Sequence, residues 1–218
     1  MPAPKKLPAD PPPGTAYEKR PDFLVAMYEQ LMSDINRHIV VVWQMVSVVG
    51  AAIVGLVVAE KQNVPTAYAT IVALVVIAWV LEHLHDSNYW YNRNLVMITN
   101  IERVFLKKDD VDHIHPYFSG HRPAGSFLEH LAIQRHYALI VAGFVFAYFF
   151  AQAVYPTLDA QAAINIPKVL AIGVFIAVIA RDQVLLKRYK RKYEQYLKIS
   201  PGIPINRKVD FGSTHGKR

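Results

Sequence analysis

Four long apolar blocks dominate the pattern of hydrophobic and polar positions along the chain. With their flanking residues they predict helical spans at 39–59, 67–86, 137–155 and 168–186. About 20 helical residues cross the hydrocarbon core of a bilayer, and these blocks are close to that length. Soluble domains distribute apolar residues in shorter periodic pieces. The pattern therefore predicts an all-α integral membrane protein with four transmembrane helices.

Helical periodicity continues beyond three of the four spans. Phe23, Met27 and Leu31 recur every fourth residue before the first span, and no helix breaker separates them from it. The same spacing follows the second span to about residue 108 and the fourth span to about residue 198. We therefore expect three long helical extensions into the cytoplasm, the first two packed side by side.

Proline, charge and capping signals divide the remaining chain. Ser126 with Glu129 three residues later is a capping box and predicts a short helix there, and Pro156 is expected to end the third span. The predicted organisation is a disordered Pro-rich arm at 1–21, a long helical hairpin at 22–108, a cytoplasmic loop and short helix at 109–136, a second hairpin with a basic cytoplasmic helix at 137–198, and a disordered basic tail at 199–218.

The placement of the basic residues predicts the orientation of the spans. The formal net charge is +7, and the loops after the first and third spans carry only Lys61 and Lys168 as basic residues. Because cytoplasmic segments are the ones enriched in lysine and arginine, both termini and the central loop are expected in the cytoplasm. A basic run after the fourth span is expected to face membrane lipid: Lys187, Arg188, Lys190, Arg191 and Lys192. Docking of a partner helix is the alternative, and no nucleic-acid-binding module accompanies the run.

Polar residues interrupt three spans at about the same depth. Glu82 follows the start of its span by about 15 residues, which is roughly 22 Å of helix, and Arg181 and Gln44 lie at roughly 21 and 24 Å by the same measure. Ionisable residues at such depth usually pair with each other or line a water-filled cavity. The sequence predicts a Glu82–Arg181 pair, either beside a permeation pathway or as a structural ion pair. The full polar layer contains Gln44, Glu82, His83, His85, Asp86, Arg181 and Asp182.

Motifs for enzymatic chemistry are absent from the sequence. The chain has no cysteine, and no nucleophile elbow, phosphate-binding loop or dinucleotide fingerprint occurs. Glu82 and His85 form one Glu-x-x-His unit, whereas di-iron bundles require two such units and further glutamates. The acidic, histidine-containing segment 109–115 lacks the glycine and distal glutamate of an EF-hand, so a solvated turn is favoured over a cation site. We expect no catalytic residue, no metal and no cofactor.

The layout of residues 20–108 resembles a known family. A helix containing Tyr-Trp-Tyr-Asn-Arg-Asn-Leu at 89–95 and Asn-Ile-Glu-Arg-Val-Phe-Leu at 100–106 follows the second span. This architecture is similar to that of the SLATT small membrane proteins of bacteria. The resemblance implies an oligomeric pore-forming effector of a nucleotide-signalling antiphage system, in the inner membrane of a bacterium. Two further spans follow, which a two-span member of that group lacks.

These observations favour a non-enzymatic, oligomeric channel or pore-type effector that is gated through its cytoplasmic helices. The helical extensions carry little soluble mass, so they need partners to bury their apolar lines and a homo-oligomer is expected. A cytoplasmic protein or nucleotide is the expected signal. A second hypothesis is a non-conducting scaffold or accessory subunit that recruits a cytosolic partner. A third is a membrane-embedded metal-dependent enzyme.

Overall fold

A computed structural model describes residues 20–105, 127–159 and 165–199. Within these ranges the chain is helical and contains no strand. The long elements are α1 (Arg20–Lys61), α2 (Thr66–Phe105), α5 (Ala132–Phe149) and α7 (Ile166–Ile199). The predicted Pro-rich arm before residue 20, the acidic segment 109–115 and the tail after residue 199 lie outside the described residues.

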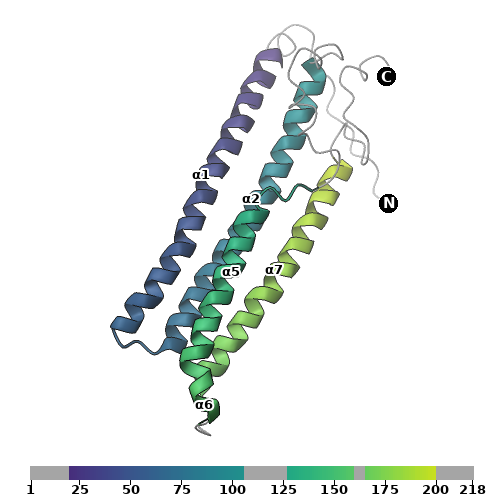
Figure 1. Ribbon diagram of the computed structural model, residues 1–218. Coiled ribbons are helices and arrows are strands. Elements are labelled where there is room, and N and C mark those ends of the chain that lie inside the picture. The colour runs from purple at the N-terminus through teal and green to yellow at the C-terminus, as the bar shows by residue number, and fades with distance from the viewer. Residues whose placement is uncertain (1–19, 106–126, 160–164, 200–218) are drawn as a thin grey trace.

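The four long helices confirm the all-α part of the prediction for the described residues. Each is long and apolar enough to cross a membrane. The three extended helices are also present: α1 is one helix of 42 residues, α2 one of 40 and α7 one of 34. Of the described helices, α1, α2 and α7 extend beyond the N-terminal end of α5 (Figure 1). We call these continuations, residues 20–37, 89–105 and 187–199, the stalk.

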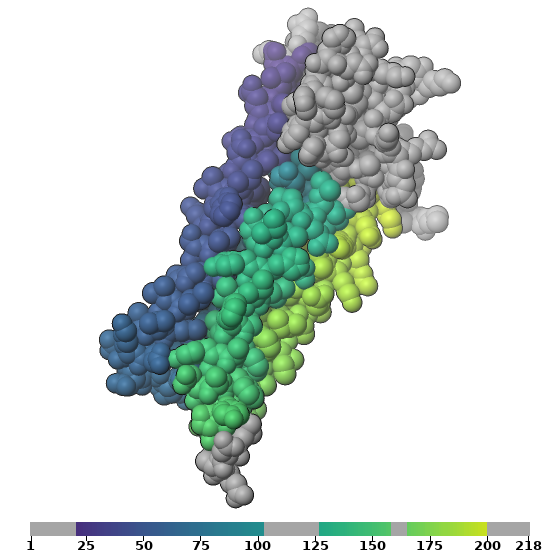
Figure 2. Space-filling model, in the orientation of Figure 1, coloured from purple at the N-terminus to yellow at the C-terminus, as the bar shows by residue number. Residues whose placement is uncertain are grey.

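Helix α2 is the centre of the bundle. In its most apolar window 44% of the residues are buried, against 11% for α1. Helices α1, α5 and α7 lie around it (Figure 1). In the space-filling view, α5 lies across the front of the bundle and hides most of α2 (Figure 2). Side chains of α2 therefore meet three different neighbours, and a polar group on α2 is able to connect them.

The contact between α1 and α2 follows a heptad pattern. The buried residues Ile35, Val42, Val49 and Leu56 recur every seven positions on α1. On α2 one line of buried positions alternates in steps of three and four, with half-buried Tyr91 continuing the line: Ala67, Thr70, Leu74, Ile77, Leu81, Leu84, Asn88, Leu95 and Ile98. Such spacing is typical of left-handed coiled coils. The two helices form an antiparallel hairpin that is apolar except near Thr70, Asn88 and the stalk.

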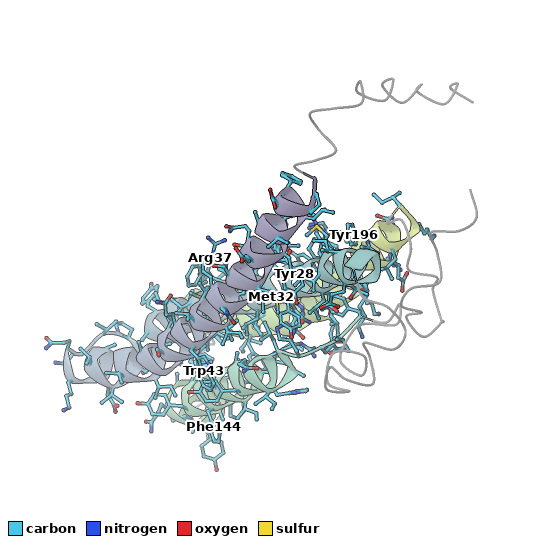
Figure 3. All side chains as sticks on the ribbon, turned by 90° about the horizontal axis from the view of Figure 1, so that it is seen from above. Tyr28, Met32, Arg37, Trp43, Phe144 and Tyr196 are labelled. Atoms are coloured by element: carbon cyan, nitrogen blue, oxygen red, sulfur yellow. The ribbon has the colours of Figure 1, made fainter. Side chains whose placement is uncertain are left out.

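In the stalk, α1 and α2 pack as predicted. Leu31 and Ile35 form an apolar cluster with Leu95, Ile98 and Ile101. The side chains of Tyr28 and Met32 lie on the side of α1 that faces α2, whereas Arg37 points away (Figure 3). The Tyr28 hydroxyl also donates a hydrogen bond to the Glu102 carboxylate at 3.3 Å.

Helices α2 and α7 run parallel to each other. Their contacts keep a nearly constant sequence separation, 99 residues for the Glu82–Arg181 pair and 103 for Asp86–Tyr189. Tyr89 and Val96 form an apolar cluster with the buried Tyr193 and Leu197. The seam between α2 and α7 therefore extends from the apolar half of the bundle into the stalk.

Two predicted boundaries are wrong. Helix α5 begins at Ala132, and residues 127–129 are not helical, because the Asn92 side chain binds the backbone of Leu128. Ser126, the expected cap, lies outside the described residues. Pro156 does not end the third span: α5 continues through a π-helical turn (Phe150–Val154) into α6 (Tyr155–Asp159). A proline lacks the amide donor of a regular helix, and a π turn directly before it changes the hydrogen-bond register at this point.

Candidate functional site

The most buried charged group in the bundle is Asp182 of α7. Its side chain is 0% exposed, and those of His85 on α2 and Arg135 on α5 are 4% and 12% exposed. His85 Nε2 lies 2.8 Å from Asp182 Oδ1, and Arg135 Nε donates to the same oxygen at 2.9 Å. Arg135 Nη2 donates to Oδ2. We call these three residues the Asp182 cluster.

The Asp182 cluster connects three helices. Both carboxylate oxygens accept hydrogen bonds, which compensates part of the desolvation of the charge. Arg135 binds in the bidentate manner that its planar guanidinium favours. Removing one partner of such a buried pair leaves a charge without compensation, which is far more costly than removing both. The cluster therefore fixes the position of α7 relative to α2 and α5.

Directly beside the cluster, the predicted Glu82–Arg181 pair is present. Arg181 Nη2 lies 2.7 Å from Glu82 Oε2. Unlike the Asp182 cluster, this pair is on the outside of the bundle, with side chains 45% and 56% exposed. Adjacent residues of α7 thus direct one acidic group inward and one basic group outward.

The other members of the predicted polar layer are divided between the seam and the surface. Asp86 lies on the α2–α7 seam and accepts a hydrogen bond of 3.2 Å from the Tyr189 hydroxyl. His83 and Gln44 are exposed, and the His83 ring contacts Trp79 edge-on. His85 is in the Asp182 cluster and Glu82 is in the outer pair, so the two ends of the Glu-x-x-His unit bind different partners. The structure therefore does not bring the polar layer together at one point.

The basic run of α7 likewise contains both exposed residues and residues that contact a neighbouring segment. Lys187, Arg188 and Arg191 are exposed. Lys190 forms an ion pair of 2.6 Å with Glu129, so its expected orientation toward lipid is replaced by a contact with the segment before α5. The ammonium group of Lys192 lies over the Tyr89 ring, 4.1 Å from its centroid.

The segment that leads into α5 is held against α2 by Asn92. This fully buried side chain donates to the carbonyl oxygens of Asn88 and Leu128, at 2.8 and 2.9 Å, and accepts from the Leu128 amide at 2.8 Å. Two residues on, the His130 ring stacks on Tyr91 with centroids 3.6 Å apart. Burial lowers the pKa of His130 from 6.5 to about 4, so this ring is neutral near pH 7.

A small cavity borders the Asp182 cluster. Its volume is about 10 Å³, and its lining includes His85, Asn88, Glu129 and Arg135. This is space for about one water molecule. The Asn88 Oδ1 atom is buried and accepts no hydrogen bond from the described residues, so a single water at this position would satisfy it. This cavity is too small to hold a hydrated ion.

The charged residues of this region form ion pairs between helices. Among the described residues, no group of three or more acidic or histidine side chains is arranged to hold a metal ion. Every described acidic group of the cluster and the outer pair has a cationic partner. The arrangement can position helices and present a charged pair to whatever covers the outer surface.

Two residues central to the site were not found from the sequence. Arg135 precedes the third span, and its charge alone did not distinguish it from the other basic residues of the loop. Asn92 lies within a polar stretch, where its pattern matched a solvated helix face. The available signal for Arg135 was its position about 20 residues, or one bilayer thickness, from the far end of its span.

Comparisons with protein-family models, with curated proteins and with solved structures gave no match.

Proposed function

We propose that the protein is a homo-oligomeric, non-enzymatic membrane channel or pore-type effector, with four transmembrane spans and both termini in the cytoplasm. The observation that carries this proposal is the exposed Glu82–Arg181 ion pair, which lies within the apolar half of the bundle. The proposed setting, antiphage defence at the inner membrane of a bacterium, follows from the resemblance to SLATT proteins.

The depth of the pair supports this proposal. Twenty helical residues extend about 30 Å, the thickness of the hydrocarbon core. Counted from Ala67 and Pro167, the core ends near residues 87 and 187. Glu82 and Arg181 then lie about 8–9 Å inside that boundary. Charged side chains in transmembrane segments usually face a protein interior or water-filled cavity rather than lipid.

A second copy of the chain would supply that environment. Within one chain Asp182 is fully buried, and the cavity beside it holds about one water, which is too little space for an ion path. An ion path therefore requires space between copies, where the Glu82–Arg181 pairs would face water. The outer positions of Gln44 and His83 add polar groups to the same surface level.

Gating would proceed through the stalk. Helices α2 and α7 are continuous from the stalk to the level of the ion pair. A signal that shifts the packing of α1 against α2 would be transmitted along these helices, because closely packed interfaces switch between discrete arrangements rather than deform. The Asp182 cluster would make α2, α5 and α7 move together.

Conductance of purified protein in liposomes tests the proposal. We expect Glu82→Gln to change the conductance or ion selectivity at least several-fold, because a ring of charged side chains controls selectivity in channels. Lys187→Gln removes one charge from the exposed surface of the same seam region and serves as the control. A strictly monomeric mass in detergent, or conductance identical in wild type and Glu82→Gln, would contradict the proposal.

A non-conducting scaffold is the second candidate. It is favoured by the apolar side chains exposed on the stalk part of α1, where Phe23 is 66% and Val25 is 50% exposed. A cytosolic partner that covers this surface would be retained on immobilised protein. Retention that disappears in Phe23→Ser, together with an absence of conductance in the wild type, would support the scaffold over the channel.

A further inference from the structure

Two cations on the seam between α2 and α7 have aromatic partners. The guanidinium carbon of Arg93 lies 4.5 Å from the centroid of the Trp90 ring and 5.7 Å from that of Tyr196. The ammonium nitrogen of Lys192 lies 4.1 Å from the centroid of Tyr89 and 5.5 Å from that of Tyr189. Among the described residues, neither cation forms an ion pair.

The hydrogen-bonding state of Arg93 points to a missing acceptor. Its Nε atom is buried and has no hydrogen-bond partner among the described residues. An arginine donates through five N–H groups, and its flat shape suits bidentate binding of a phosphate group. The Trp90 and Tyr196 rings hold the guanidinium in place. Binding of a phosphate group by its donors therefore costs less side-chain entropy than it would for an unrestrained arginine.

The position of the two cations along the bundle matches the phospholipid headgroups. With the core boundary near residues 87 and 187, Arg93 and Lys192 lie about 9 and 8 Å beyond it. The headgroup region on each side of a bilayer is about 5–8 Å thick. Helical side chains tilt toward the helix N-terminus, which in α2 and α7 brings both cationic groups back from these backbone positions toward the core boundary. Trp90, which contacts Arg93, is 36% exposed, and tryptophan and tyrosine are enriched at this level of membranes.

We infer that the Arg93 and Lys192 side chains form a binding site for the phosphate of an anionic phospholipid, with the exposed Trp90 ring contacting its glycerol backbone. The site lies at the point where the parallel helices α2 and α7 enter the stalk. A lipid bound there contacts both helices and so stabilises their register. The inference requires insertion of the protein in a membrane and does not depend on conduction of ions.

Native mass spectrometry of the full chain in detergent, titrated with phosphatidylglycerol or phosphatidylcholine, tests the inference. One basic residue near an anionic surface contributes enough binding free energy to change affinity roughly fivefold. We expect Lys192→Gln or Arg93→Gln to weaken phosphatidylglycerol binding roughly fivefold and the double variant roughly 25-fold. The control Lys187→Gln/Arg191→Gln removes the same charge from exposed positions of α7 and should change the affinity less than twofold.

Three results would overturn the inference. Equal retention of phosphatidylglycerol and phosphatidylcholine would exclude recognition of the anionic headgroup. An equal loss in the control would assign binding to the basic run as a whole. Displacement of the lipid by excess inorganic phosphate would assign the site to a free anion. Lys192 is exposed, so the single variant Lys192→Gln keeps the test informative if a substitution of Arg93 prevents folding.

A fluorescence measurement locates the lipid independently. The chain has three tryptophans, so Trp43→Phe/Trp79→Phe leaves Trp90 as the only one. We expect brominated phosphatidylglycerol to quench Trp90 more than brominated phosphatidylcholine at equal concentration, and Lys192→Gln to remove that difference. Quenching that is the same for both lipids would refute a headgroup site at Trp90. If the wild-type protein binds the lipid as expected but shows no conductance, the channel proposal is refuted and the lipid inference stands.

Discussion

Replacement of Asp182 by asparagine changes one buried charge and almost no volume. In the wild type both carboxylate oxygens accept hydrogen bonds from Arg135, and His85 binds Oδ1. Asparagine offers one acceptor oxygen and an NH2 group with two donors, and that NH2 group would face an N–H group of Arg135. The substitution thus leaves a guanidinium that is only 12% exposed without a charged partner.

The size of the effect follows from this burial. Removing one partner of a buried ion pair costs about 3–5 kcal/mol of the free energy of unfolding. For a chain of roughly this size, 1 kcal/mol shifts the melting temperature by about 2–4 °C. Asp182→Asn should therefore melt roughly 6–20 °C below the wild type. The control Lys190→Gln changes another residue of α7 and breaks its exposed ion pair with Glu129. This loss should lower the free energy of unfolding by about 0–1 kcal/mol.

Thermal melts in detergent, followed by helical circular dichroism, measure both variants. A double variant, Arg135→Met/Asp182→Leu, completes the test because an apolar replacement of the whole pair is often neutral or stabilising. We expect it to recover most of the lost stability. If Asp182→Asn melts within about 3 °C of Lys190→Gln, the Asp182 cluster does not hold the three helices together and the reasoning is refuted.

Three further substitutions test other parts of the structure. Asn92→Ala removes three hydrogen bonds to Asn88 and Leu128 and should lower the free energy of unfolding by about 2–4 kcal/mol. Chemical denaturation measures this loss, with the exposed Asn36→Ala as the control. An equal loss in the two variants would contradict the role of Asn92. Ile77→Ala at a 0% exposed position should cost about 2–5 kcal/mol, whereas Val75→Ala, 54% exposed, should cost less than about 1 kcal/mol in detergent. His130, with its pKa lowered to about 4, takes up a proton more readily unfolded than folded, so its contribution is complete above pH 6.5 and is lost as the pH falls toward 4. His130→Phe should therefore flatten the melting temperature between pH 6.5 and 4, whereas exposed His136→Phe should not; parallel pH profiles of all three proteins would contradict it.

The helices and the outer ion pair were predictable from the sequence because both depend on position along a single helix. Apolar length and spacing determine where α1, α2 and α7 extend. The level of Glu82 and of Arg181 follows from the helix rise once the outer ends of their spans are known. Since α2 and α7 both start at the same side, equal distances from those ends place the two residues together.

The Asp182 cluster was not predictable in the same way, because its contacts depend on rotation and on a third helix. Helical periodicity gives the direction of Asp182 relative to its own helix and not the neighbour that it faces. Arg135 precedes an apolar span whose start is determined by the Asn92 contact with Leu128, a contact between segments 36 residues apart. The π turn before Pro156 further changes the length of that span.

The wide sequence separation of the contacts made by α2 has a consequence for synthesis of the chain. The α1–α2 hairpin is complete once residue 105 has been made, but His85 meets Asp182 only 97 residues after its own synthesis. At about 5–20 residues per second, the ribosome needs on the order of 5–20 s to reach that residue. During this interval the α2 surface that later faces α7 has no partner from its own chain. The nascent hairpin is thus the stage at which a chaperone, an insertion factor or a neighbouring nascent copy has the best access to this polar surface.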